Sequence, residues 1–160
     1  MYIVALPYVL YKIVFADNIH TDRIPTLAIF GAPANLSLAG FISLPNIISY
    51  WGNDAYWVIV IILTIIALST TLFLYVCFFK IFKTKFNPTY ASLTFPTAIG
   101  SLAMLKVSSA LSINNANQTL LLSHTFNIIG YIEITIATII ISYVLVRYLI
   151  LIFKIFFKKS

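Results

Sequence analysis

The stretch that decides the fold occurs twice: residues 25–33 read PTLAIFGAP, and residues 88–96 read PTYASLTFP. The two copies begin 63 residues apart, and each opens a long apolar segment that is followed by a second one. Self-similarity at a fixed period indicates a duplicated unit, which here is a helical hairpin. Two successive copies predict parallel helical-hairpin repeats, an arrangement that lines the substrate path of many membrane transporters.

The composition argues against a soluble domain. Of the 160 residues, 61% are hydrophobic and 9% are charged, which is more apolar surface than one core of this size can bury. A helix needs about 20 apolar residues to cross a hydrocarbon layer of about 30 Å. Such segments occur at 24–44, 56–79, 88–111 and 119–147. We therefore predict an all-α, polytopic membrane protein that forms a single transmembrane domain over residues 1–160.

The apolar residues at the start of the chain are too few for a further span. Residues 1–15 read MYIVALPYVLYKIVF and lack the charged start and cleavage site of a signal peptide. We interpret them as the end of a truncated helix. A short re-entrant or interfacial segment is the alternative. With this end of a fifth helix, the chain carries about four complete transmembrane helices.

The basic residues predict the orientation in the membrane. Lys80, Lys83 and Lys85 cluster in one connection, and further lysines lie in the tail at 148–160. The connection before the second span and the connection before the fourth contain no Lys or Arg. By the positive-inside rule, the Lys-rich connection and the tail are then cytoplasmic. The placement of the basic residues therefore predicts a multi-pass protein of the cell membrane with its C-terminus in the cytoplasm. The net charge of +6 is explained by this topology, and we expect no nucleic-acid partner.

The segments differ in character within each repeat. The first and third segments, 24–44 and 88–111, are rich in Gly, Ala, Ser and Thr, which let helices approach closely or face a wet cavity. The second and fourth, 56–79 and 119–147, are dominated by bulky apolar residues suited to lipid contact. We predict inner, pore-lining helices and outer, lipid-facing helices.

Each inner segment contains a proline. Pro33 and Pro96 lie eight residues after the proline that opens their copy of the repeat, where each is expected to remove a backbone hydrogen bond and kink the helix. The freed carbonyl needs a hydroxyl or cavity water as partner, which favours a solvated path. A packing kink without solvent is the alternative. Candidate pore-lining residues around the kinks are Ala32, Thr94 and Gly100.

The residues around the second proline resemble a known family. FNPTYASLTFPTAIGSLAMLK, residues 86–106, resembles the signature of the tellurite-resistance and C4-dicarboxylate transporters, which include the slow-type plant anion channels. PTLAIFGAPANLSLAGF, residues 25–41, is similar to an earlier inner helix of that family. The resemblance implies five hairpins per subunit, with the odd helices around a pore, and trimers with one pore per subunit. This chain would supply the C-terminal half of a ten-helix pore.

The resemblance implies a membrane channel or secondary transporter for small anions such as C4-dicarboxylates, sulfite or tellurite-like oxyanions. The alternative is a non-transporting remnant, or a partner subunit that requires a separately encoded N-terminal half. The expected partners are the lipid bilayer, a small anion and either a homo-trimer or that half. We expect no enzyme, no metal site and no cofactor, since catalytic and phosphate-binding motifs are missing from the sequence.

The resemblance also implies a gate. In the family an aromatic ring on the ninth helix plugs the pore, and the match places it at Phe95, next to the kinking Pro96. The other repeat has Ala32 at the equivalent place. A phenyl ring among small residues can close a narrow apolar path. Ordinary packing is the alternative, because the chain has 13 phenylalanines.

Two charges fall within predicted helices. Lys106 comes near the external end of its inner helix, where it would attract anions to a pore mouth or extend to the headgroups. Glu133 lies inside the last helix, where a charge costs about 2.5 to 3.5 kcal/mol. It needs a partner such as Asn127 or Thr135, or a bound proton. A packing or proton-linked role is favoured for Glu133, because a negative charge would repel an anion.

Overall fold

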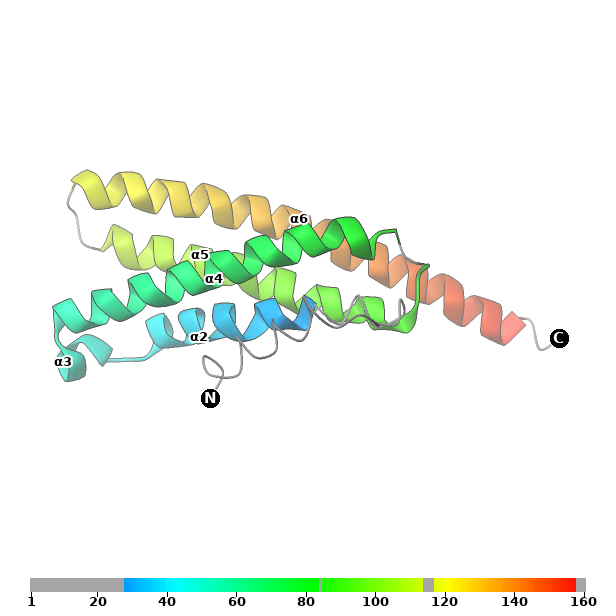
Figure 1. Cartoon of the computed structure of the whole chain (residues 1–160), viewed down its shortest axis with the longest axis horizontal. Helices are drawn as coiled ribbons and strands as arrows, with labels where there is room; N and C mark the ends of the chain where they lie inside the picture. The colour runs from blue at the N-terminus through cyan, green and yellow to red at the C-terminus, as the bar shows by residue number, and fades with distance from the viewer. Residues whose placement is uncertain (1–27, 84, 114–116, 158–160) are drawn as a thin grey trace.

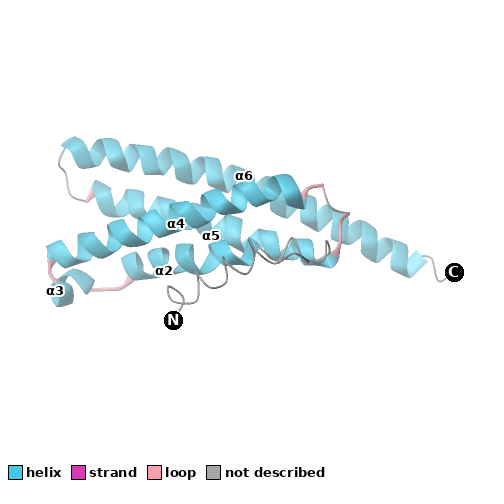
Figure 2. Ribbon diagram, viewed as in Figure 1, coloured by secondary structure: helices cyan, strands magenta, loops and turns pink. Residues whose placement is uncertain are grey.

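The computed structural model describes residues 28–83, 85–113 and 117–157. All regular secondary structure in these ranges is helical (Figure 2). The elements are α2 (Gly31–Ser43), α3 (Ile47–Trp51), α4 (Asn53–Ile81), the 3-10 helix η2 (Pro88–Leu93), α5 (Thr94–Ser112) and α6 (Asn117–Phe157). The predicted truncated helix at 1–15 lies outside the described residues.

The helices form two hairpins that point the same way. In Figure 1, α2 and α5 run in one direction while α4 and α6 run in the other. Helix α5 packs most extensively on its hairpin partner α6 and on α2, and α2 packs on α4. The two first helices of the hairpins are therefore in direct contact, and the second helices flank them.

The two hairpins begin with the same backbone feature. Helix α2 starts at Gly31 and α5 starts 63 residues later at Thr94, and a 3-10 segment precedes each start, at 28–30 and at 88–93. Pro33 and Pro96 are each the third residue of their α-helix. The structure thus differs from the predicted mid-helix kink. Each proline lies in the first turn of its α-helix, whose amide groups have no partner within that α-helix. The change of helix type comes directly before this turn.

Helices α4 and α6 are longer than predicted. Helix α6 continues to Phe157 and projects beyond the bundle at its C-terminal end (Figure 1), so residues 148–157 of the expected tail are helical. The apolar run LILIF after Tyr148 favours this continuation. Two of the described helices, α4 and α6, are long and apolar enough to cross a membrane. Both expose bulky apolar side chains, among them Ile61, Ile65 and Ile139.

The core consists of two apolar clusters, one toward each end of the bundle. One is built around Leu38, Val60 and Met104 and lies toward the end that carries α3. The other is built around Leu74, Leu93 and Val144 and lies toward the end that carries η2. Residues 69–73 of α4 and 130–135 of α6 lie between the two clusters, and this middle layer holds part of the candidate site.

Candidate functional site

Helix α5 has one face that the rest of the described chain covers only in part. Phe95, Leu102, Lys106 and Ser109 recur at helical spacing and therefore share this face. The Phe95 side chain is 53% exposed, and its ring contributes to a shallow groove with Ile141 and other residues of α6. We call the face of these four α5 residues the open face.

Helix α2 presents a similar uncovered face. Ile29 and Leu36 are exposed there, and Pro33 between them is half-buried. Ala32 lies on the other side of the helix and is 5% exposed. The residue equivalent to Phe95 in the first hairpin is thus a small side chain in the core, whereas Phe95 itself lies at the surface of the described chain.

Hydroxyl groups satisfy carbonyls at the junction of η2 and α5. The Thr94 Oγ1 donates to the Ala91 carbonyl at 2.8 Å, and the Thr97 Oγ1 donates to the Leu93 carbonyl at 2.9 Å. A threonine that bonds in this way to the carbonyl three or four residues earlier competes with the helical backbone bonds and favours a bend. Of the two partners expected for carbonyls near the proline, the hydroxyl is present at this junction.

Aromatic residues fix the position of η2 against α4 and α6. The Tyr90 hydroxyl donates to the Ile81 carbonyl at 2.5 Å, and the Tyr148 hydroxyl donates to the Pro88 carbonyl. The Phe86 ring contacts the rings of Tyr90 and Tyr148, and the Arg147 guanidinium lies 5.9 Å from its centroid. These contacts fix the position of the start of α5, and therefore of Phe95, along the long axis of the bundle.

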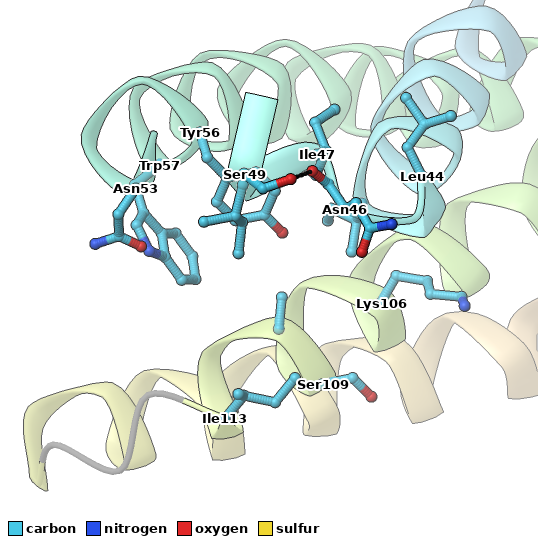
Figure 3. A pocket seen from close by; sticks show the side chains of 13 residues that line it. Leu44, Asn46, Ile47, Ser49, Asn53, Tyr56, Trp57, Lys106, Ser109 and Ile113 are labelled. Atoms are coloured by element: carbon cyan, nitrogen blue, oxygen red, sulfur yellow. Dashed lines mark hydrogen bonds between the residues drawn. The ribbon is translucent and has the colours of Figure 1, made fainter. Parts of the chain in front are cut away.

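A cleft of about 660 Å³ lies at the opposite end of α5 (Figure 3). Lys106 and Ser109 of α5 form one wall, and the other wall is formed by the end of α2, α3 and the start of α4. Asn46 and Ser49 add an amide and a hydroxyl, and the Ser49 Oγ donates to the Asn46 carbonyl at 2.7 Å. The half-buried Lys106 is the cationic group of this cleft among the residues that line it.

Polar side chains from three helices meet in the middle layer, around Gly100 of α5. Glu133 of α6, Asn35 of α2 and Thr71 of α4 are all at least nine-tenths buried. A Cβ atom on Gly100 would lie 3.1 Å from Glu133 Oε2, and 3.8 Å from both Asn35 Nδ2 and Thr71 Oγ1. We call these four residues the polar layer.

The hydrogen bonds of the polar layer are incomplete. Asn35 Nδ2 donates to the Gly31 carbonyl and to Thr71 Oγ1, both at 2.9 Å. Asn35 Oδ1 and Glu133 Oε2 are buried without a hydrogen-bond partner. Two buried acceptors therefore lack a donor, and each costs about 1 to 3 kcal/mol if it stays so.

The structure brings only some of the predicted site residues together. Phe95 and Lys106 share the open face, and Gly100 meets Glu133 on the buried side of α5. Of the partners expected for Glu133, Thr135 is exposed and donates to the Tyr131 carbonyl of its own helix. The predicted residues thus divide between an open face and the polar layer.

Sequence reasoning missed Asn35 and Thr71. The signal that could have found Asn35 is its position as an amide among small residues of an inner segment, on the same side as the buried Leu38. Thr71 carries no such signal, because α4 contains other hydroxyl residues, such as Thr64 and Thr70, that bond to their own helix.

Comparison with protein families places the chain in a described family. Residues 1–149 match the family model described as "Voltage-dependent anion channel". The match covers most of the chain and includes both copies of the repeat. No curated protein and no solved structure matches this chain.

Proposed function

Because the chain belongs to the voltage-dependent anion channel family, we propose that it contributes the inner helices α2 and α5 to a path for small anions. Members of this family are channels or transporters and not enzymes, and α4 and α6 support a membrane location. In this proposal all four long helices cross the bilayer, and the C-terminal end of α6 lies in the cytoplasm.

The observation that carries the proposal is the open face of α5. It combines an aromatic ring, one leucine, one serine hydroxyl and one cation; Phe95, Leu102 and Ser109 are exposed, and Lys106 is half-buried. A face turned to lipid would be expected to carry bulky apolar residues throughout, as on α4 and α6. Ser109 and Lys106 fit a wall that faces water and attracts anions.

Phe95 is the proposed gate. It is the bulkiest side chain of the open face and lies 11 residues from Lys106 along α5, which is about 16 Å at 1.5 Å per residue. An anion drawn to Lys106 would therefore travel about half a membrane thickness before it met the ring. The substrate class we propose is C4-dicarboxylates, sulfite or tellurite-like oxyanions.

A flux assay tests the proposal. The full chain is reconstituted into liposomes loaded with malate or sulfite, and anion efflux is recorded for the wild type and for Phe95→Ala. We expect efflux to rise several-fold in Phe95→Ala, because the ring no longer closes the path. Phe79→Ala is the matched control, since Phe79 is 78% exposed on the outer helix α4 and its removal should leave efflux unchanged.

Equal efflux from Phe95→Ala and from the wild type, both above empty liposomes, would contradict the gate. Absence of efflux from every form would favour the second candidate, a non-transporting remnant or partner subunit. The observation behind that candidate is the uncovered face of α2 beside the open face of α5, since both need further inner helices. A homo-trimer or a separately encoded N-terminal half could supply them, and co-reconstitution with such a half would then restore efflux.

A further inference from the structure

The polar layer lies between two apolar clusters and is buried inside the helix bundle. On α6, Phe126 packs against one cluster and Ile140 belongs to the other, with Glu133 midway between them. Glu133 is 4% exposed. An ionised carboxylate at such a site is stable only with a counter-charge or several donors.

The described residues offer Glu133 neither. No Lys, Arg or His of the described chain forms an ion pair with it, and Glu133 Oε2 accepts no hydrogen bond. The titratable side chain that interacts with Glu133 electrostatically is Tyr75 of α4. The groups that α2 and α5 place at the polar layer, Asn35 and Gly100, do not titrate.

The two unsatisfied atoms are of the same kind. Asn35 Oδ1 and Glu133 Oε2 are both acceptors, and both residues lie against Gly100. Two acceptors repel each other unless a donor hydrogen lies between them. A metal ion is a poor candidate, because Ca²⁺ and Mg²⁺ need about six or more oxygen ligands and the polar layer offers two free acceptors and one threonine hydroxyl.

We propose that Glu133 is an intramembrane proton-binding site, in which the protonated carboxyl group donates a hydrogen bond to Asn35 Oδ1. The carboxylate gains one proton on Oε2, and no other bond changes. The single proton satisfies both orphan acceptors and links α6 to α2. Asn35 Nδ2 continues the link to Thr71 of α4.

Gly100 makes the site possible. A Cβ atom at this position would lie only 3.1 Å from Glu133 Oε2, closer than side chains normally approach. The absence of a side chain therefore lets the carboxyl group pass over α5 toward α2. The proton thus closes a hydrogen-bonded network that joins α6, α2 and α4 beside Gly100 of α5, and its loss would leave an uncompensated charge between these helices.

The chain contains one glutamate, Glu133, which makes a direct test possible. Cell-free synthesis with glutamate ¹³C-labelled at the side-chain carboxyl group, into lipid vesicles, places the label on this residue alone. Infrared difference spectra against the unlabelled protein then report its protonation state. At neutral pH we expect the isotope-shifted band at the position of a protonated carboxyl group, with a small further shift in D₂O.

A matched pair of variants tests the partner. In Asn35→Leu the carboxyl band should move to the higher frequency of a group without a hydrogen-bond acceptor. In Asn127→Leu, six residues from Glu133 on the same helix, the band should stay in place. A labelled band at the carboxylate position in the wild type at neutral pH would overturn the proposal, as would a carboxylate band that depends on Na⁺. A band that moves in Asn127→Leu and not in Asn35→Leu would overturn the assignment of Asn35.

Discussion

The two hairpins share a change from 3-10 helix to α-helix and differ in the side chains next to it. Helices α2 and α5 begin at equivalent residues, and each carries a proline in its first turn. Beside that proline the first hairpin has Ala32, which is buried, and the second has Phe95, which is exposed. The two copies of the repeat therefore have the same backbone arrangement, while the residue proposed as a gate is found in one copy.

The polar layer extends this contrast. In the repeat, Asn35 of α2 corresponds to Ala98 of α5, and Glu133 of α6 corresponds to Thr70 of α4. The layer is therefore not present twice. It forms once, where the two hairpins meet, because each contributes polar groups that the other lacks.

The largest effect is expected from making the first hairpin resemble the second. Ala32→Phe places a ring at a buried position, and overpacking of this kind costs about 1 to 3 kcal/mol or more. The reciprocal change, Phe95→Ala, removes an exposed ring and should alter stability by about 0.5 kcal/mol or less. Unfolding in mixed micelles measures both. Equal losses would contradict the different environments of the two positions.

A smaller effect is expected where the second hairpin packs more tightly than the first. Gly130 of α6 corresponds to Ala67 of α4, and a Cβ atom on Gly130 would lie 2.7 Å from the Leu105 side chain and 3.3 Å from its backbone nitrogen. Gly130→Ala should therefore destabilise the protein by about 1 to 2 kcal/mol, despite the better helix propensity of alanine.

Gly40→Ala is the control for Gly130→Ala, because no atom lies within 4 Å of its added Cβ. It should be neutral or slightly stabilising in the same unfolding measurement. If Gly130→Ala proves as stable as Gly40→Ala, the close approach of α5 and α6 is not a feature of the native protein.

The polar layer should respond to loss of a single hydroxyl. Thr71→Val keeps the shape of the side chain but leaves Asn35 Nδ2 with one acceptor fewer, which should cost about 1 kcal/mol. Thr138→Val removes an exposed hydroxyl that bonds only within its own helix, and its unfolding free energy should match the wild type. A neutral Thr71→Val would show that the bond between α2 and α4 contributes nothing.

The smallest effect is expected at the prolines. Pro33→Ala should change the unfolding free energy by less than about 1 kcal/mol, because a proline in the first helical turn costs the helix no hydrogen bond. A kink inside the helix would instead give a gain of about 3 kcal/mol on replacement. Unfolding in micelles together with far-ultraviolet circular dichroism distinguishes the two results.

Much of the fold could be predicted from the sequence because it follows from local pattern. The repeat predicted two equivalent hairpins, although α2 and α5 begin at Gly31 and Thr94 and not at 24 and 88. The assignment of inner and outer helices stays a prediction. The end of α6 could not be located, since the apolar residues after Arg147 allow both a tail and a longer helix. The change from 3-10 helix to α-helix before Pro33 was not predicted, because a proline indicates that a helix is interrupted without specifying a 3-10 turn.

The candidate site also has one part that could be predicted from the sequence and one part that could not. The open face could be predicted from helical spacing once Phe95 and Lys106 were assigned to one helix. The residues that meet Glu133 around Gly100 could not, because Asn35 and Thr71 are far from it in the sequence and come near it through the rotation of packed helices. Helix rotation depends on tertiary packing, which the periodicity of one segment does not determine.

The central claim is that the open face of α5 meets water inside the membrane. The chain has one cysteine, Cys77, so Cys77→Ala provides a background for single cysteines at Leu102 and Ser109, with Ile139 of α6 as the lipid-facing control. A charged, membrane-impermeant thiol reagent added to sealed vesicles should label the first two positions and leave Ile139→Cys unlabelled. Failure to label Leu102→Cys and Ser109→Cys, in protein that reacts fully once detergent is added, would contradict an aqueous path along α5.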